Sequence, residues 1–400
     1  MKEDSPFTPG YPVSPELFVG REKQLKEIQR YIKLVASGKM ENVFLSGERG
    51  IGKTSLANYL RELALKENFI TIHVFLGGVC ELEELVRIVF EEIYKDYNTQ
   101  NWFKKVSDFF GKYIREVDLF GVSVSFSPPN KDLKELVRKF PEAIYNIIDK
   151  LKDDKKGIFI VLDDINGIVS NDDFAHWYKS FVDKIATSKK VFPILLMPVG
   201  LPEIRDTLSK QQPSLMRIFR VVEFTKLSDE EVKNFFIKAF KKVNKEVNSK
   251  ELDLMVMFSS GLPVFMQEIG DAVFLNSQDK VITFDDVRYG IVDAADRIGK
   301  KYLDPQVYRT LRSDKYRTIL RKMGNKLIFK FKKTEMKKLL NEKEIKVFDN
   351  FLRRMRELGI IIEDIEEGPG AYRFVNDLYP VYIMIENIRY KSSKKNKNYF

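Results

Sequence analysis

The chain has 400 residues, of which 44% are hydrophobic and 32% are charged. This composition is typical of a soluble globular protein of two or three domains and excludes an intrinsically disordered chain. No apolar run reaches the ~18 residues that a membrane span needs. A single cysteine excludes a disulfide framework or a cysteine-based zinc site within one chain. Because the N-terminal residues also show no apolar signal segment, we expect a cytoplasmic protein without a membrane partner.

The net charge of +10 is unevenly distributed along the chain. Residues 310–400 contain 22 Lys and Arg against 12 Asp and Glu, which leaves 46 of each kind in residues 1–309. The whole positive excess therefore lies in the last quarter of the chain. A basic segment of this kind favours an anionic partner, and the alternative is a simply solvated surface.

We assign residues 1–14 to an N-terminal arm. A glycine-rich motif lies further along the chain. Residues 47–54 read G-E-R-G-I-G-K-T, the G-x-x-x-x-G-K-[ST] spacing of a phosphate-binding loop. An apolar segment precedes it and an amphipathic one follows, so the loop joins a strand to a helix. The glycines let backbone N–H groups turn toward a phosphate, and the helix N-terminus adds partial positive charge. The predicted nucleotide-binding residues here are Gly47, Glu48, Arg49, Gly50, Ile51, Gly52, Lys53, Thr54 and Ser55.

This loop predicts ATP and Mg²⁺ as cofactors. In a loop of this kind Lys53 reaches the β- and γ-phosphates, and Thr54 ligates Mg²⁺. A second motif is expected to complete the metal site. Residues 158–162 are five consecutive apolar residues, followed by Asp163 and Asp164, which predicts a central parallel strand buried on both faces. Asp163 would then hold Mg²⁺ through water, and Asp164 would orient or deprotonate the attacking water. The alternative is a buried strand that ends in an acidic turn.

Two further apolar segments, 69–75 and 191–197, complete a predicted α/β P-loop core over 15–225, a three-layer αβα sandwich with a parallel sheet. His73 alternates within the first of them and is interpreted as a core histidine. Residues 97–132 interrupt the alternation and form an insertion, which is either a partner-binding element or part of the core. Its aromatic residues between Trp102 and Tyr113 follow helical spacing, and residues 122–126 alternate like a strand.

Residues 17–25, with F-V-G-R-E at 18–22, resemble the entry motif of AAA+ and STAND ATPases. In those families the segment packs over the adenine, which implies nucleotide contacts for Phe18, Val19 and Arg21. The Asp163–Asp164 ending is more similar to STAND proteins, since most AAA+ proteins have Asp-Glu there. Arg217 falls where such families often carry a phosphate-sensing or finger arginine. It would then be catalytic and act from a neighbouring copy in a homo-oligomer, and the alternative is an ordinary surface residue.

The following segment, 226–304, resembles the all-α helical lid of these families. Ser228 and Glu231 form a predicted capping box at its start. Gly261-Leu262-Pro263 is similar to the G-x-P signature of the STAND lid, which implies a nucleotide contact for Pro263. Together these motifs resemble the archaeal ATPase family of the STAND class over about residues 15–300. The lid lacks the sensor-2 arginine, and 197–200 offers no polar sensor-1 residue, so we expect slow turnover and a switch more than a motor.

Residues 305–390 resemble a winged helix, with three predicted helices and a hairpin around Gly368-Pro369-Gly370, before a basic tail at 391–400. In that fold the third helix enters the major groove of duplex DNA. The wing carries four carboxylates between 363 and 367, which would repel phosphate, so protein docking remains the alternative. The predicted nucleic-acid contacts are Lys346, Asn350, Arg353 and Arg354.

The sequence thus predicts a Mg²⁺-dependent ATPase of the AAA+/STAND type that acts as a nucleotide-controlled switch coupled to DNA. The alternative is a regulator that binds ATP or ADP without hydrolysing it and whose winged helix docks protein partners.

Overall fold

The computed structural model describes residues 4–95, 114–117, 124–126, 128–309 and 313–397. The chain divides into two compact units. One is Ser14–Thr225, and the other combines Met1–Val13 with Lys226–Phe400. Two chain connections, at 13–14 and 225–226, therefore join the units.

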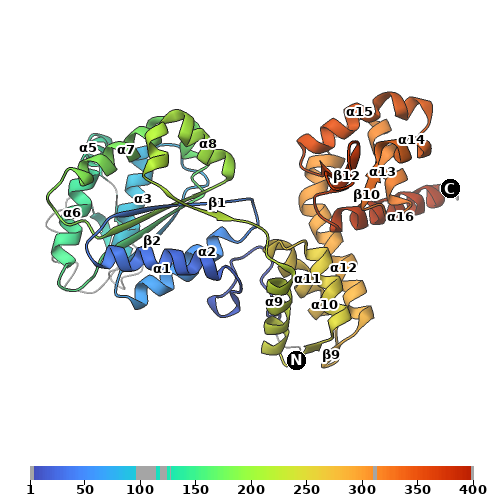
Figure 1. Ribbon diagram of the computed structural model, residues 1–400, viewed down its shortest axis with the longest axis horizontal. Coiled ribbons are helices and arrows are strands. Elements are labelled where there is room, and N and C mark those ends of the chain that lie inside the picture. Colours follow the sequence, from blue (N-terminus) through green and yellow to red (C-terminus); the bar gives the residue numbers. More distant parts are fainter. Residues whose placement is uncertain (1–3, 96–113, 118–123, 127, 310–312, 398–400) are drawn as a thin grey trace. The chain divides into compact units, whose positions relative to one another are not determined.

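A parallel sheet of five strands forms the centre of the first unit, in the order β2-β5-β6-β1-β7 (Figure 1). β1, β5 and β6 are buried nearly throughout, as expected of strands covered on both faces. β6 separates β1, which leads into the glycine loop, from β5, which ends at Asp163. The strands are β1 (Glu41–Gly47), β2 (Ile70–Phe75), β5 (Ile158–Asp163), β6 (Ile194–Gly200) and β7 (Arg220–Phe224).

Helices cover both faces of this sheet and complete a three-layer sandwich. α1 and α2 lie on one face, whereas α3 and α5 to α8 enclose the main apolar cluster on the other (Figure 1). This arrangement confirms the predicted α/β fold class of the core. The helices are α1 (Glu22–Ala36), α2 (Lys53–Lys66), α3 (Leu82–Lys95), α5 (Asn130–Arg138), α6 (Phe140–Leu151), α7 (Asp173–Ala186) and α8 (Pro202–Gln211), with short 3₁₀ turns η1 (Pro15–Leu17), η3 (Ile168–Ser170) and η4 (Pro213–Arg217).

The insertion predicted over 97–132 is described in part. β3 (Ile114–Val117) and β4 (Val124–Phe126) pair in antiparallel fashion, so the strand predicted over 122–126 is a strand over its last three residues. The aromatic helix predicted between Trp102 and Tyr113 lies outside the described residues.

The lid is built from four α-helices and one short parallel strand pair. The predicted capping box is confirmed, because Glu231 N donates to Ser228 Oγ at 3.3 Å and Ser228 N donates to Glu231 Oε2 at 2.8 Å. α12 continues into a π-helical segment, Gly299–Tyr308. The elements are α9 (Asp229–Lys242), β8 (Glu246–Val247), α10 (Ser249–Ser259), α11 (Pro263–Asn276), β9 (Val281–Ile282) and α12 (Phe284–Ile298).

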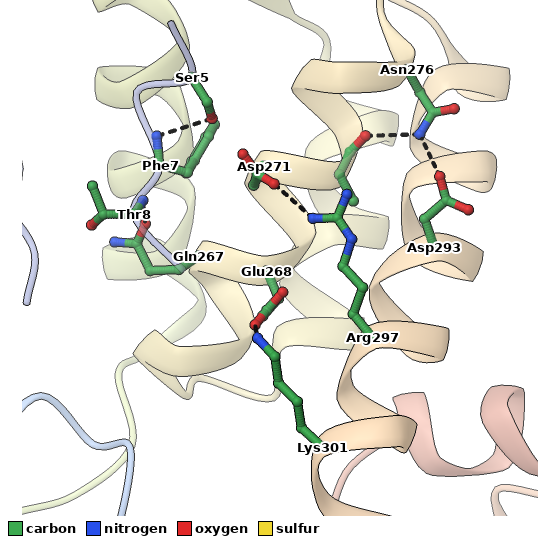
Figure 2. A network of polar contacts seen from close by, with 11 residues as sticks. Ser5, Phe7, Thr8, Gln267, Glu268, Asp271, Asn276, Asp293, Arg297 and Lys301 are labelled. Carbon is green, nitrogen blue, oxygen red and sulfur yellow. Dashed lines mark hydrogen bonds and ion pairs between the residues drawn. The ribbon is translucent and has the colours of Figure 1, made fainter. Parts of the chain in front are cut away.

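The N-terminal arm packs against the lid helices (Figure 2). The Phe7 ring is buried and lies 5.1 Å from that of Phe240 and 5.9 Å from that of Phe235, both on α9. The backbone N–H of Thr8 donates to Gln267 Oε1 at 2.8 Å. Gly270 admits the Phe7 ring, since a Cβ at position 270 would lie 2.2 Å from it. The arm is thus part of the lid unit.

The C-terminal part of the chain is a winged helix, as predicted. β10 follows the first of three helices, and β11 and β12 follow the third. Together they form an antiparallel sheet in the order β10-β12-β11, whose β11–β12 hairpin is the wing. One face of α15 carries buried Phe348, Phe351, Leu352 and Met355 and faces the core of the domain. The elements are α13 (Asp314–Gly324), β10 (Lys330–Lys332), α14 (Lys333–Leu339), α15 (Glu342–Glu357), β11 (Ile361–Glu363) and β12 (Ala371–Phe374).

One difference from the sequence expectation concerns the C-terminus. α16 (Leu378–Lys397) runs as one helix through residues 391–397, which the sequence analysis assigned to a basic tail. Its apolar half contacts α13 and α12 of the same unit. The helix continues beyond the packed half because lysine is a good helix former and needs no buried face.

Candidate nucleotide-binding site

The glycine loop connects β1 to α2 at the carboxyl end of the sheet. Gly50 and Gly52 have φ angles of 75° and 95°, left-handed conformations that glycine adopts without a steric cost. Ile51 is buried between them and anchors the loop, whereas Glu48 and Arg49 are exposed. α2 begins at Lys53, so the N-terminal turn that contains Thr54 and Ser55 brings the partial positive charge of the helix end to the loop. Such a helix start is a site for a phosphate group.

The ammonium group of Lys53 lies over this loop. Its Nζ donates to the carbonyl oxygens of Gly47 and Glu48 at 2.7 and 2.8 Å. Burial lowers the pKa of Lys53 below its usual value, and the carboxylates of Asp163 and Asp164 act in the opposite direction. The lysine of the loop and the two aspartates after β5 therefore share one site.

The two aspartates occupy different environments. Asp163 is the last residue of β5 and is buried, whereas Asp164 is exposed in a left-handed conformation with φ of 58°. Gly77 leaves room for Asp164, since a Cβ there would lie 3.0 Å from Asp164 Oδ2. One carboxylate is thus held in the sheet and the other projects from its edge.

Asn166 contacts Asp164 and was not identified from the sequence. Its Nδ2 donates to Asp164 Oδ1, and its Oδ1 accepts from the backbone N–H of Leu201 at 3.4 Å. Leu201 follows β6 directly, so Asn166 links the ends of two adjacent strands. The signal in the sequence was a polar residue two positions after Asp164, in D-D-I-N.

His73 is buried, as the sequence interpretation expected of a core histidine, but it contacts the site. Its Nε2 lies 3.1 Å from Asp163 Oδ2, and its Nδ1 lies 3.0 Å from Asn58 Oδ1 on α2. Both contacts escaped the sequence analysis, because the first depends on β2 lying beside β5 and the second on α2 packing against β2.

The entry segment is held against the glycine loop. Arg21 is buried with φ of 64°, donates from Nη2 to Ile51 O at 3.4 Å, and places its guanidinium 4.5 Å from the centre of the Phe224 ring. Phe18 stacks on Tyr59 of α2 with ring centres 5.2 Å apart. Val19, which lies between Phe18 and Arg21 in the sequence, is half-buried.

Two of the predicted site residues lie away from these contacts. Arg217 is exposed at the end of η4, and none of the contacts described for Lys53, Asp163 or Asp164 involves it. Pro263 begins α11 and belongs to the other unit. Its turn is fixed by Gly261, whose carbonyl accepts from Leu227 N at 2.9 Å.

Residues 17–178 match the family model of the AAA ATPase domain, and this range includes the glycine loop and both aspartates. This part of the chain is therefore similar to an AAA ATPase domain. The fold of the chain is similar to that of two solved structures. These are the ORC2 protein of Aeropyrum pernix, at 12% identity over 98% of each chain with a TM-score of 0.58, and a Walker-type ATPase of Pyrococcus abyssi, at 14% identity over 92% of this chain and 96% of that one with a TM-score of 0.54. At these identities the likeness shows the fold alone.

A curated protein similar to the chain is an uncharacterised HTH-type transcriptional regulator of Methanocaldococcus jannaschii. It is 21% identical over 225 residues, which are 54% of this chain and 51% of the relative. The chain therefore spans about half the length of the curated relative that it matches.

The oxygen groups of this site suit Mg²⁺. The Thr54 hydroxyl and the Asp163 carboxylate are hard oxygen ligands, and Mg²⁺ is usually held by one or two carboxylates together with substrate phosphates. Among the described residues, no cluster of three or more His, Cys, Asp or Glu side chains offers an all-protein metal cage. This pattern fits an ion that arrives with a nucleotide.

The predicted DNA-binding residues share the solvent face of α15. Lys346, Asn350 and Arg353 are exposed, and Arg354 is half-buried. Glu357 accepts from Arg354 Nη1 at 3.1 Å and lies 3.9 Å from Arg353 Nε. The arginines are therefore preorganised on the helix, and an exposed ion pair of this kind is weak enough to exchange for a phosphate.

The acidic wing is partly neutralised within the domain. Glu363 is paired with Arg356 of α15, and the buried Asp364 lies 3.5 Å from Lys330 Nζ. Only Glu366 and Glu367 remain at the exposed tip of the wing without an ion pair among the described residues. The wing is thus less repulsive to phosphate than its four carboxylates suggested. Within the described part of the chain, no helix has the length and apolar character needed to cross a membrane.

Proposed function

We propose that this protein binds ATP with Mg²⁺ at the glycine loop, hydrolyses it slowly, and uses the bound nucleotide to control duplex DNA binding by its winged helix. The observation that carries the proposal is that the glycine loop with Lys53 follows β1 and the two aspartates end β5 in one parallel sheet, with only β6 between these strands. One ammonium, one buried carboxylate and one exposed carboxylate at a glycine loop are the charged groups that a P-loop ATPase uses.

The chemistry follows from these groups. Water attacks the γ-phosphorus, the bond to the β–γ bridging oxygen breaks, and Asp164 orients the water and takes its proton. Lys53 stabilises the negative charge on the phosphate oxygens. Thr54 and Asp163 would hold Mg²⁺, which when bound neutralises further phosphate charge. Phe18, Val19 and Arg21 are proposed to border the adenine.

A titration with ATP tests the proposal first. Tight binding is expected with Mg²⁺ and weaker binding with EDTA, because the proposed site holds the metal between protein and phosphates. Binding that does not respond to Mg²⁺ would contradict it. The ORC2 relative was solved as ADPNP and ADP complexes, which agrees with a nucleotide at this fold.

Asn166 is a second polar side chain beside Asp164 at the proposed catalytic site. Because 197–200 offers no polar side chain, we propose that Asn166 holds the Asp164 carboxylate in the orientation that the water needs. Replacing Asn166 by alanine is expected to lower kcat by roughly 10- to 100-fold, since a catalytic group misplaced by ~1 Å costs about that much. Steady-state kinetics on the folded variant measures this. An unchanged kcat would mean that Asn166 only joins two strands.

Charge reversal of Arg353 and Arg354 to glutamate tests the DNA proposal. Duplex DNA affinity at low salt is expected to fall by about 10-fold or more, and the salt dependence of log K to lose about two units of slope, because two phosphate contacts disappear. Fluorescence anisotropy across a salt series measures both quantities.

The matched control reverses Lys238 and Lys241, two exposed lysines of α9 outside the winged helix. Equal losses in both double variants would show a general charge effect and not a reading helix. The HTH-type transcriptional regulator among the relatives is consistent with DNA as the ligand.

The second candidate is a regulator that does not hydrolyse ATP and docks a protein through its wing. Ile365 at the wing tip is 90% exposed, beside Glu366 and Glu367, and an exposed aliphatic residue between carboxylates suits a protein partner better than DNA. No duplex binding by the wild-type protein at low salt would favour this candidate.

A further inference from the structure

His73 lies on the carboxylate that the proposed magnesium site needs. β2 pairs with β5, and Phe75 lies opposite Asp163. His73 lies two residues before Phe75, which is the last residue of β2. Its Nε2 is 3.1 Å from Asp163 Oδ2, and the two residues are only 6% and 4% exposed. A carboxylate oxygen has no hydrogen to donate, so this contact is favourable only when Nε2 carries the proton and donates it.

The second ring nitrogen is held by the helix that follows the glycine loop. Nδ1 lies 3.0 Å from the amide of Asn58, which is one helical turn after Thr54 on α2. The Asn58 amide serves either state of Nδ1, because its oxygen accepts from an N–H and its NH₂ group donates to a bare nitrogen. Asn58, His73 and Asp163 therefore form a continuous chain from α2 to the end of β5.

Phe75 protects this chain from water. Strand alternation places it on the same face of β2 as His73, and the two rings stack 4.3 Å apart at 24°. Phe75 is itself 62% exposed, whereas the imidazole beneath it is buried. A hydrogen bond shielded in this way is stronger than one in open solvent.

We propose that His73 is a positioning residue for magnesium. It donates Nε2–H to Asp163 Oδ2, which fixes the carboxylate rotamer and leaves the other oxygen for the metal. The inference rests on the proposed function, since it assigns a partner to the same site. Hydrogen-bonded partners of a metal-binding residue typically contribute 10- to 100-fold to metal affinity.

Magnesium titrations of ATP binding test the role. His73→Phe keeps a flat ring against Phe75 and removes both hydrogen bonds, whereas His73→Gln keeps an N–H donor. The Mg²⁺ concentration for half-maximal ATP binding is expected to rise ~10- to 100-fold in His73→Phe and to stay within about 3-fold of wild type in His73→Gln. ATP binding in EDTA is expected to be equal in all three proteins.

A matched control replaces the other histidine, His176, which is exposed on α7, by phenylalanine. This variant is expected to keep the wild-type Mg²⁺ midpoint. If His73→Phe weakened ATP binding equally with and without Mg²⁺, His73 would have a structural role only. If the Mg²⁺ midpoint of His73→Phe were unchanged, His73 would have no role in magnesium binding. Either result overturns the inference.

Nitrogen-15 NMR of histidine-labelled protein tests the hydrogen bond without nucleotide. The chain has only two histidines, so the His73 signals are assigned by their loss in His73→Gln. A protonated Nε2 is expected, and a bare Nε2 would overturn the inference. If ATP binding by the wild-type protein did not depend on Mg²⁺, the proposed function would be refuted. The NMR result would then show separately whether His73 holds Asp163.

Discussion

Replacing Lys53 by alanine is expected to weaken ATP binding strongly. In the structure its ammonium is already held above the loop by two carbonyl oxygens, at 2.7 and 2.8 Å, so little ordering remains to be done when phosphate arrives. Each charge-assisted hydrogen bond to phosphate contributes about 1.5–3 kcal/mol. Two of the three N–H groups are engaged by the carbonyl oxygens, so loss of the remaining hydrogen bond to phosphate predicts an affinity roughly 10- to 100-fold weaker, which isothermal titration with ATP measures.

Lys66 is the matched control for this variant. It is the last residue of the same helix and is exposed, and its replacement by alanine is expected to leave ATP affinity unchanged. If Lys53→Ala bound ATP as the wild type does, the nucleotide would have to bind somewhere other than the glycine loop.

Replacing Asp164 by asparagine is expected to separate ATP binding from hydrolysis. Asparagine has the same shape and tolerates the left-handed conformation that position 164 adopts, so the local fold is retained. Only the charge and the basicity of the side chain are lost. We expect kcat to fall by about 10²-fold or more, in the range that a positioned general base contributes, with ATP affinity nearly unchanged.

The control for the change of charge is Glu203→Gln on α8, an exposed carboxylate outside the site. This variant is expected to turn over ATP at the wild-type rate. A wild-type kcat in Asp164→Asn would show that another group orients the water.

The glycine loop and the two aspartates could be predicted because each motif is contiguous in the sequence. Residues 47–54 carry their own strand-to-helix context, and five apolar residues before Asp163 are enough to predict a central strand. The winged helix was predictable for a similar reason, since apolar spacing marks each of its helices and Gly359 and Gly368 mark its turns.

The partners of the aspartates could not be predicted, because they depend on the order of strands in the sheet. His73 reaches Asp163 across 90 positions only because β2 lies beside β5, and Asn166 reaches Leu201 only because β6 lies on the other side of β5. Strand order is a tertiary property that local spacing does not contain. His73 was therefore interpreted as a core histidine, from the alternation of its strand alone.

The charge balance of the winged helix was also hidden from the sequence. In the sequence, the run of wing carboxylates predicts repulsion of phosphate. In the folded domain, however, Glu363 pairs with Arg356 and Asp364 lies beside Lys330. The end of α16 was misjudged for a related reason. A lysine-rich segment without apolar spacing reads as a tail, whereas the helix simply continues out of its packed half.

Steady-state ATP turnover tests the central claim most directly. It would be measured with and without duplex DNA over a range of protein concentration, with Asp164→Asn as the baseline. The account predicts slow turnover above that baseline that rises with DNA. A further rise with protein concentration, lost in Arg217→Ala, would support Arg217 acting from a neighbouring copy. Turnover that equals the Asp164→Asn baseline under every condition would contradict the account and leave a nucleotide-binding regulator.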